Sequence, residues 1–126
     1  MKILNILLWA AQLLLAAGFA WAASMKLIQP AGVLAGQWPW TAEYPGLVVL
    51  TGILDTLAAT GLVLPTLLRI APVWTIRAAA GAVALMAAAI VFHGSRSEPV
   101  GFNVFFGAIA GFVWWGRTKT LLRPGK

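Results

Sequence analysis

A stretch of apolar residues from Pro45 to Pro65 carries a single acid, Asp55, near its middle. A helix of this length spans the hydrocarbon core of a bilayer, which is about 30 Å thick. A charged side chain at that depth is costly, so it normally faces other helices and often marks a functional site. The stretch therefore predicts a transmembrane helix over residues 47–64 that ends at Pro65 and turns Asp55 inward.

Three further segments are long and apolar enough to cross a membrane, and we expect helices over residues 3–24, 73–93 and 100–116. Of the 126 residues, 61% are hydrophobic and 10% are charged, whereas soluble domains carry about 25% charged residues. The first segment resembles a signal peptide in having a basic residue, Lys2, at its start. It is longer, however, than the apolar region of about 7–15 residues that signal peptides contain. We interpret it as a retained helix. The sequence thus predicts an all-α membrane protein, a four-transmembrane-helix bundle that forms one domain over residues 1–126.

The segment from residue 25 to residue 45 has a different character, because prolines and glycines interrupt any long helix. It contains the rings of Trp38, Trp40 and Tyr44, and such amphipathic rings favour the membrane–water boundary. We expect residues 25–45 to form an interfacial loop, which can include a short helix, over one end of the bundle. An anchoring role is favoured over the alternative of a lid above a ligand.

The basic residues are distributed unevenly along this topology. Four spans place seven of them on one side: Lys2, Arg69, Arg77, Arg117, Lys119, Arg123 and Lys126. Only Lys26 and Arg96 fall on the other side. Because cytoplasmic loops carry the excess of Lys and Arg, we predict both termini in the cytoplasm and a multi-pass protein of the bacterial cytoplasmic (inner) membrane. The net charge of +6 is explained by this placement beside anionic lipids, so no nucleic-acid partner is expected.

Small residues are spaced so that helices can approach one another closely. Gly18 and Ala22 lie four residues apart in the first segment, and Gly52 lies in the second. Gly107 and Gly111 form a GxxxG motif in the fourth. We expect these five positions to pack helices within the chain. Formation of a homo-oligomer through the GxxxG motif is the alternative.

Five polar residues are expected in the outer half of the bundle, and they form a candidate ligand or proton site: Lys26, Thr51, Asp55, His93 and Asn103. Thr51 precedes Asp55 by one helical turn and is placed to donate a hydrogen bond to it. Lys26 is the first candidate for an ion pair with Asp55, followed by His93 and Arg96. The functional interpretation is a pocket for a small polar or quinone-like ligand, in which Asp55 and His93 exchange protons. The alternative is a purely structural ion pair.

Several chemistries are disfavoured by the composition. The absence of cysteine excludes disulfides and thiol redox catalysis. One histidine and three acids make a metal centre unexpected, since common sites take three or four protein ligands. We therefore expect no catalytic residues, no metal and no resident cofactor, with a quinone as the one candidate ligand.

Several short motifs together resemble the DoxX-like family. They are Gly52-Ile53-Leu54-Asp55-Thr56-Leu57 and Gly61-Leu62-Val63-Leu64-Pro65 in the second segment, Met25-Lys26-Leu27, Phe92-His93, and Asn103. The resemblance covers nearly the whole chain, although the family commonly has glutamate where this sequence has Asp55. It implies a four-helix membrane bundle and a link to quinone-dependent redox, because a relative is a subunit of a thiosulfate:quinone oxidoreductase.

The leading functional hypothesis is a non-catalytic subunit or accessory protein of this type, in contact with the lipid bilayer and a membrane redox partner protein. The alternative is a small proton-coupled transporter or exporter that uses Asp55. Small multidrug exporters carry their acid in the first helix, and residues 3–24 contain none. An enzyme acting alone is a third hypothesis, and it would need a bound cofactor.

Overall fold

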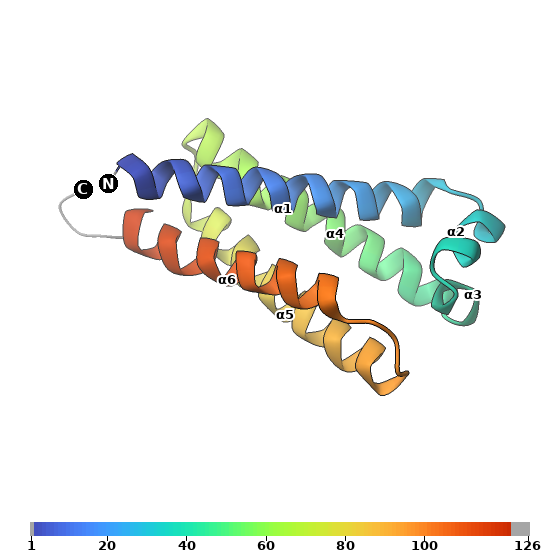
Figure 1. The fold of residues 1–126 in the computed structure, drawn as a ribbon. Coiled ribbons are helices and arrows are strands. Elements are labelled where there is room, and N and C mark those ends of the chain that lie inside the picture. Colours follow the sequence, from blue (N-terminus) through green and yellow to red (C-terminus); the bar gives the residue numbers. More distant parts are fainter. Residues whose placement is uncertain (1, 122–126) are drawn as a thin grey trace.

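Residues 2–121 are described in the structure, a computed structural model, and they form helices joined by short connections. In chain order the helices are α1 (Lys2–Ile28), α2 (Ala31–Gln37), α3 (Trp40–Glu43), α4 (Pro45–Leu68), α5 (Val73–Ser95) and α6 (Gly101–Leu121). The four long helices run side by side, and the two short ones lie at one end (Figure 1). The prediction of an all-α fold is confirmed.

Three of the long helices, α1, α4 and α5, have the length and composition needed to cross a membrane. The remaining long helix, α6, is less hydrophobic, because Asn103, Arg117 and two tryptophans lie within it. Large apolar side chains such as Leu13, Ile53 and Val91 are exposed on the outer faces. A helix that is apolar on its outer face as well as its inner one is typical of a membrane protein.

The long helices form a closed ring in which α1 packs against α4 and α6, and α5 packs against the same two. The core between them contains Leu15, Phe19, Leu62, Ala79 and Phe106. These residues come from all four helices and lie in the middle of the bundle. They form an apolar layer that separates its two ends.

The ends of α1 and α4 differ from the prediction. We expected helices over 3–24 and 47–64, but α1 continues to Ile28 and α4 passes through Pro65 to Leu68. Proline removes one backbone donor, and near a helix end this loss is tolerated in membrane helices. Arg69 caps the end of α4: it has a left-handed φ of 58°, and its backbone N–H donates to the carbonyl of Pro65.

Residues 25–45 contain more helix than the interfacial loop that we predicted, since they include the last residues of α1, the short helices α2 and α3, and the first residue of α4. The prolines begin helices here, since Pro30 and Pro39 precede α2 and α3 and Pro45 is the first residue of α4. Proline suits this position because its fixed φ fits a helix start and no backbone donor is lost. Trp40 is only 8% exposed and packs with Leu34, so it faces the protein rather than the boundary.

Gly18 and Gly107 allow close approach between helices, as does Gly52 between α1 and α4. A Cβ atom on Gly18 would lie against the ring of Phe106, which crosses from α6. A Cβ atom on Gly107 would lie 3.3 Å from the Cβ of Met86 on α5.

Gly111 does not have this role, because a Cβ atom there would meet nothing within 4 Å. The expectation that both glycines of the GxxxG motif pack within the chain is therefore wrong for Gly111. Ala22 lies on the wall of a cavity, described below, instead of at a close helix contact.

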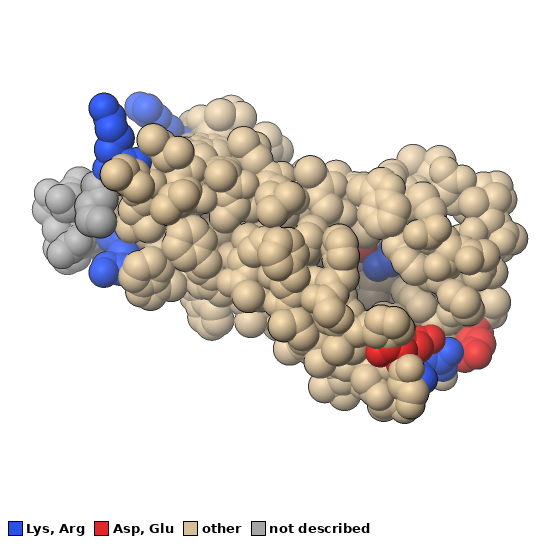
Figure 2. Space-filling model, in the orientation of Figure 1, with Lys and Arg blue, Asp and Glu red and all other residues tan. Residues whose placement is uncertain are grey.

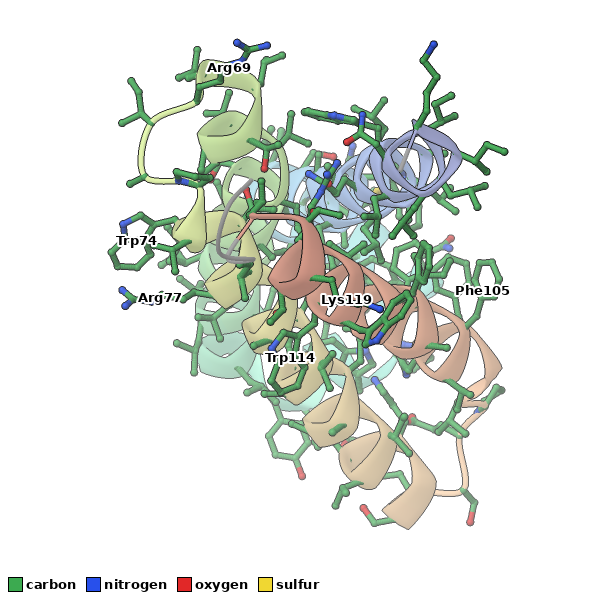
Figure 3. All side chains as sticks on the ribbon, turned by 90° about the vertical axis from the view of Figure 1, so that its left-hand side faces the viewer. Arg69, Trp74, Arg77, Phe105, Trp114 and Lys119 are labelled. Carbon is green, nitrogen blue, oxygen red and sulfur yellow. The ribbon has the colours of Figure 1, made fainter. Side chains whose placement is uncertain are left out.

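Charged side chains gather at the two ends of the bundle. Figure 2 shows Lys and Arg at the end where α1 begins and α6 finishes. Figure 3 views that end and shows Arg69, Arg77 and Lys119 there, with the rings of Trp74 and Trp114. The acidic side chains lie in the opposite half of the molecule (Figure 2).

Candidate functional site

A cavity of about 930 Å³ lies in the half of the bundle that α2 and α3 cover. Its wall includes residues of all four long helices and of the segment from Gln37 to Trp40. All five polar residues singled out in the sequence line it: Lys26, Thr51, Asp55, His93 and Asn103. The fold thus brings together residues that are spread over most of the chain.

Lys26 and Asp55 form an ion pair on the cavity wall. Lys26 Nζ donates to Asp55 Oδ2 at 2.8 Å, and the two side chains are 12% and 3% exposed. Gly52, one turn before Asp55, makes this approach possible, because a Cβ atom there would lie 3.2 Å from the Cβ of Lys26 and 2.9 Å from Cδ2 of Leu27. The glycine lets α1 come close enough to α4 for the lysine to reach the acid.

Two tryptophan rings flank the ammonium group of Lys26. Its Nζ is 5.9 Å from the ring centre of Trp38 and 5.8 Å from that of Trp40. At these distances a cation is attracted by the negative face of an aromatic ring. A lysine ammonium has three N–H donors, and within residues 2–121 only the bond to Asp55 uses one.

Thr51 does not hydrogen-bond to Asp55, so the predicted bond between them is wrong. Its hydroxyl donates to the backbone carbonyls of Leu47 at 2.8 Å and Val48 at 3.3 Å. A threonine within a helix commonly bonds the carbonyl three or four residues earlier, and that local bond is made here. Thr51 still lines the cavity.

The two alternative partners for Asp55 pair with other acids at the rim of the cavity. His93 Nδ1 is 2.7 Å from Glu98 Oε1, and Arg96 Nε donates to the same oxygen at 3.2 Å. Arg96 Nη1 also donates to Glu43 Oε2 at 2.8 Å. These bonds connect the turn between α5 and α6 to α3, across the end of the bundle.

Glu98 makes this rim sensitive to pH. The hydrogen bond from His93, and then that from Arg96, holds the pKa of the Glu98 carboxyl below its ordinary value of 4.5. A carboxyl whose pKa is lowered by folding stabilises the folded state at every pH above its ordinary pKa. This stabilisation is lost as the pH falls through the lower pKa of the folded state. We expect the melting temperature in detergent to fall as the pH is lowered from about 6 to about 3. Glu98→Gln is expected to reduce this fall, and an unchanged pH profile in that variant would contradict the assignment.

Residues 10–116 match the model of the DoxX-like family. The chain belongs to the DoxX-like family. The matched region contains all five polar residues of the cavity wall and most of the four long helices. We found no match among curated proteins or among solved structures.

This DoxX-like protein also has a polar network around the buried side chains of Gln12 and Arg117, which sequence reasoning missed. Arg117 was counted among the basic residues on the cytoplasmic side, but it is 2% exposed. Its Nε donates to Gln12 Oε1 and its Nη1 donates to Asn5 Oδ1 at 2.8 Å, while Gln12 Nε2 donates to the carbonyl of Leu62. Asn5 and Gln12 lie seven residues apart, on one face of α1. Two amides on one face of an apolar helix need polar partners, and that was the available signal.

The site of this DoxX-like protein combines a charged wall with an otherwise apolar lining. Apart from the polar residues named above, the lining is mainly Ala, Leu, Met and aromatic residues, among them Leu85, Met86 and Phe92. In residues 2–121 no group of three or more His, Asp or Glu side chains is arranged to hold a metal ion. The arrangement suits a largely apolar molecule with a polar group that accepts hydrogen bonds from Lys26.

Proposed function

We propose that this DoxX-like protein is a non-catalytic membrane subunit or accessory protein that binds a quinone-like molecule and serves a quinone-linked redox enzyme. The cavity of about 930 Å³, with a buried ion pair on an otherwise apolar wall, is the observation that carries the proposal. Ligand pockets typically measure about 300–1,000 Å³ and combine an apolar lining with a few placed polar groups.

The proposed topology has α6 as a fourth span and both termini in the cytoplasm of a bacterium. α6 packs along α1 and α5, and exposes Val104, Phe105 and Trp115 on its outer side. The gathering of basic side chains at the end that holds the start of α1 and the finish of α6 supports this orientation. The cavity then lies in the outer half of the membrane.

In the proposed complex a quinone carbonyl accepts a hydrogen bond from one of the remaining donors of Lys26. Asp55 holds the ammonium group in place, and the rings of Trp38 and Trp40 lie within reach of a flat ligand. A charge-assisted hydrogen bond in a water-poor cavity is stronger than a neutral one. Lys26 is therefore the residue on which recognition of the head group depends.

Quenching of tryptophan fluorescence by a benzoquinone without a tail tests this proposal. We expect Lys26→Met to weaken binding at least about tenfold, because a hydrogen bond to a charged group contributes about 1.5–3 kcal/mol. Lys2→Met is the matched control, since Lys2 is exposed at the other end of the bundle. This variant should bind the benzoquinone with the same affinity as the wild type.

Equal affinity in the wild type and in Lys26→Met would contradict the assignment of the head group to this cavity.

The partner protein is tested by affinity purification in mild detergent. Recovery of the protein with neither a redox enzyme nor a quinone would contradict the role of an accessory subunit.

The structure offers less support for the alternative of a proton-coupled exporter. The carboxylate of Asp55 is occupied by Lys26, and the apolar layer around Phe19, Leu62 and Phe106 lies between the cavity and the basic end. A transport site needs access to both sides of the membrane, so a binding role is favoured. Proton movement in proteoliposomes that is lost in Asp55→Asn would favour transport instead.

A further inference from the structure

α1 and α6 contact one another along only part of their length. Their side-chain contacts run from the Asn5–Arg117 hydrogen bond to the Phe19–Phe106 ring pair, whose centroids are 6.0 Å apart. Beyond this ring pair no hydrogen bond or ring contact joins the two helices within residues 2–121, and the wall of the cavity begins. The helices therefore separate on the side of the bundle that holds the ion pair.

The cavity opens through this gap. Figure 2 shows a hollow in the flank of the molecule, and a basic and an acidic side chain are visible at its base. Lys26 and Asp55 line the cavity at this level. The flank of a membrane-embedded bundle faces lipid, so the opening leads into the bilayer and not into water.

The opposite approach, from the aqueous end, is covered. α2 and α3 lie at that end, and the side chain of Trp40, the first residue of α3, is buried. Arg96 bonds both Glu43 and Glu98, which joins α3 to the turn between α5 and α6. A ligand dissolved in the lipid reaches the opening without crossing these contacts.

A second hollow, an apolar groove, lies next to the opening on the outer side of the α1–α6 contact. This groove, of about 420 Å³, is lined by Ala10, Ala11, Leu14, Phe105, Ala108 and Phe112, among others. Leu14 in the groove is followed at four-residue spacing by Gly18 and Ala22, which line the cavity, so both hollows lie along one row of α1. On α6, Phe105 in the groove follows Phe102 in the cavity by three residues. Figure 3 shows Phe105 projecting from the outer side of α6.

We propose that the ligand of the cavity is an amphiphile that enters sideways between α1 and α6 and leaves its apolar tail in the α1–α6 groove. The inference rests on the proposed function and extends it from the head group to the tail. From Ala22 to Ala10 the groove and the opening follow α1 for about 18 Å, at about 1.5 Å per residue. Lipid is as apolar as the groove, so the groove retains the tail through close packing between small side chains and not through the hydrophobic effect.

The experiment uses a benzoquinone with a decyl tail that carries a photoreactive diazirine at its far end, bound to the full chain in lipid nanodiscs. After irradiation, mass spectrometry locates the label. We expect the groove residues of α1 and α6 to carry about tenfold more label than the exposed lipid-facing residues of α5, a ratio that corresponds to about 1.4 kcal/mol of preference.

Ala108→Trp fills the groove, and we expect it to abolish this preference. Ala87→Trp is the matched control, because Ala87 is also exposed but lies outside both hollows. It is close to α6 as well, since its neighbour Met86 packs beside Gly107. It should leave the labelling pattern unchanged. Label that is spread equally over the outer faces of α1, α5 and α6 would overturn the proposal that the tail binds in the groove.

The benzoquinone without a tail separates the two proposals. If it binds and depends on Lys26 while the tail label is spread evenly, the proposed function stands and the groove is wrong. If the wild type binds neither quinone, both proposals are wrong.

Discussion

Lys26→Met is expected to lower the free energy of unfolding by about 2–3 kcal/mol, and the further change Asp55→Leu is expected to restore part of that loss. Each single substitution leaves one buried charged group without its partner, and such a group costs more than the pair contributes. Asp55 is the more deeply buried member, so losing Lys26 is the more damaging change. The double variant should therefore be more stable than the sum of the two single effects predicts, by about 1–2 kcal/mol. Thermal or denaturant unfolding in detergent measures the stability of the four proteins in this double-mutant cycle: the wild type, the two single variants and the double variant.

The pair of Arg96 and Glu43 serves as the control for this cycle. Their side chains are 25% and 55% exposed, and exposed ion pairs typically contribute less than about 1 kcal/mol. Arg96→Met and Glu43→Gln should therefore show almost no coupling. Additive effects for Lys26 and Asp55 would mean that the two side chains do not form a buried pair.

Gly61→Ala is expected to destabilise the protein by about 1–3 kcal/mol, while the same substitution at Gly111 stabilises it by about 0.5–1 kcal/mol. A Cβ atom on Gly61 would lie 2.8 Å from the Cβ of Ala78. Both atoms are fixed to their backbones, so no rotamer change relieves the contact and α4 must move away from α5. At Gly111 the added methyl group meets nothing within 4 Å, and alanine is the better helix former.

Melting temperatures of the two variants in the same detergent give the comparison. Because both substitutions add one methyl group to a helix, the difference between them isolates the contact with Ala78. A Gly61→Ala variant as stable as Gly111→Ala would show that α4 and α5 are farther apart than described.

The general fold and the principal ion pair were predictable because each follows from one strong constraint. Long apolar segments have few alternatives to membrane-crossing helices. An acid in the middle of such a segment must find a partner, and Lys26 was the nearest basic residue on the same side of the membrane. The glycine at position 52 carried a further signal, since it stands one turn from the acid and permits the close approach.

The features that were missed depend on competition between local and long-range bonds. Thr51 has a backbone carbonyl within reach in its own helix, and that bond removed it from Asp55. Arg117 was counted as one more boundary charge, although two amides on α1 offered it a buried position. Pro65 was taken as a stop, whereas α4 continues for three more residues to Leu68. A pattern along one segment does not show which partner another segment will supply.

The Arg117 network has a consequence for the order in which the chain assembles during synthesis. Gln12 and Asn5 precede Arg117 in the chain by 105 and 112 residues, so the amides reach the bilayer well before their guanidinium partner. Gln12 Nε2 can find the carbonyl of Leu62 once α4 is in the membrane, but the amide oxygens of Asn5 and Gln12 meet their donor only when α6 arrives. A chain cut short of α6 would leave these two oxygens without the guanidinium group.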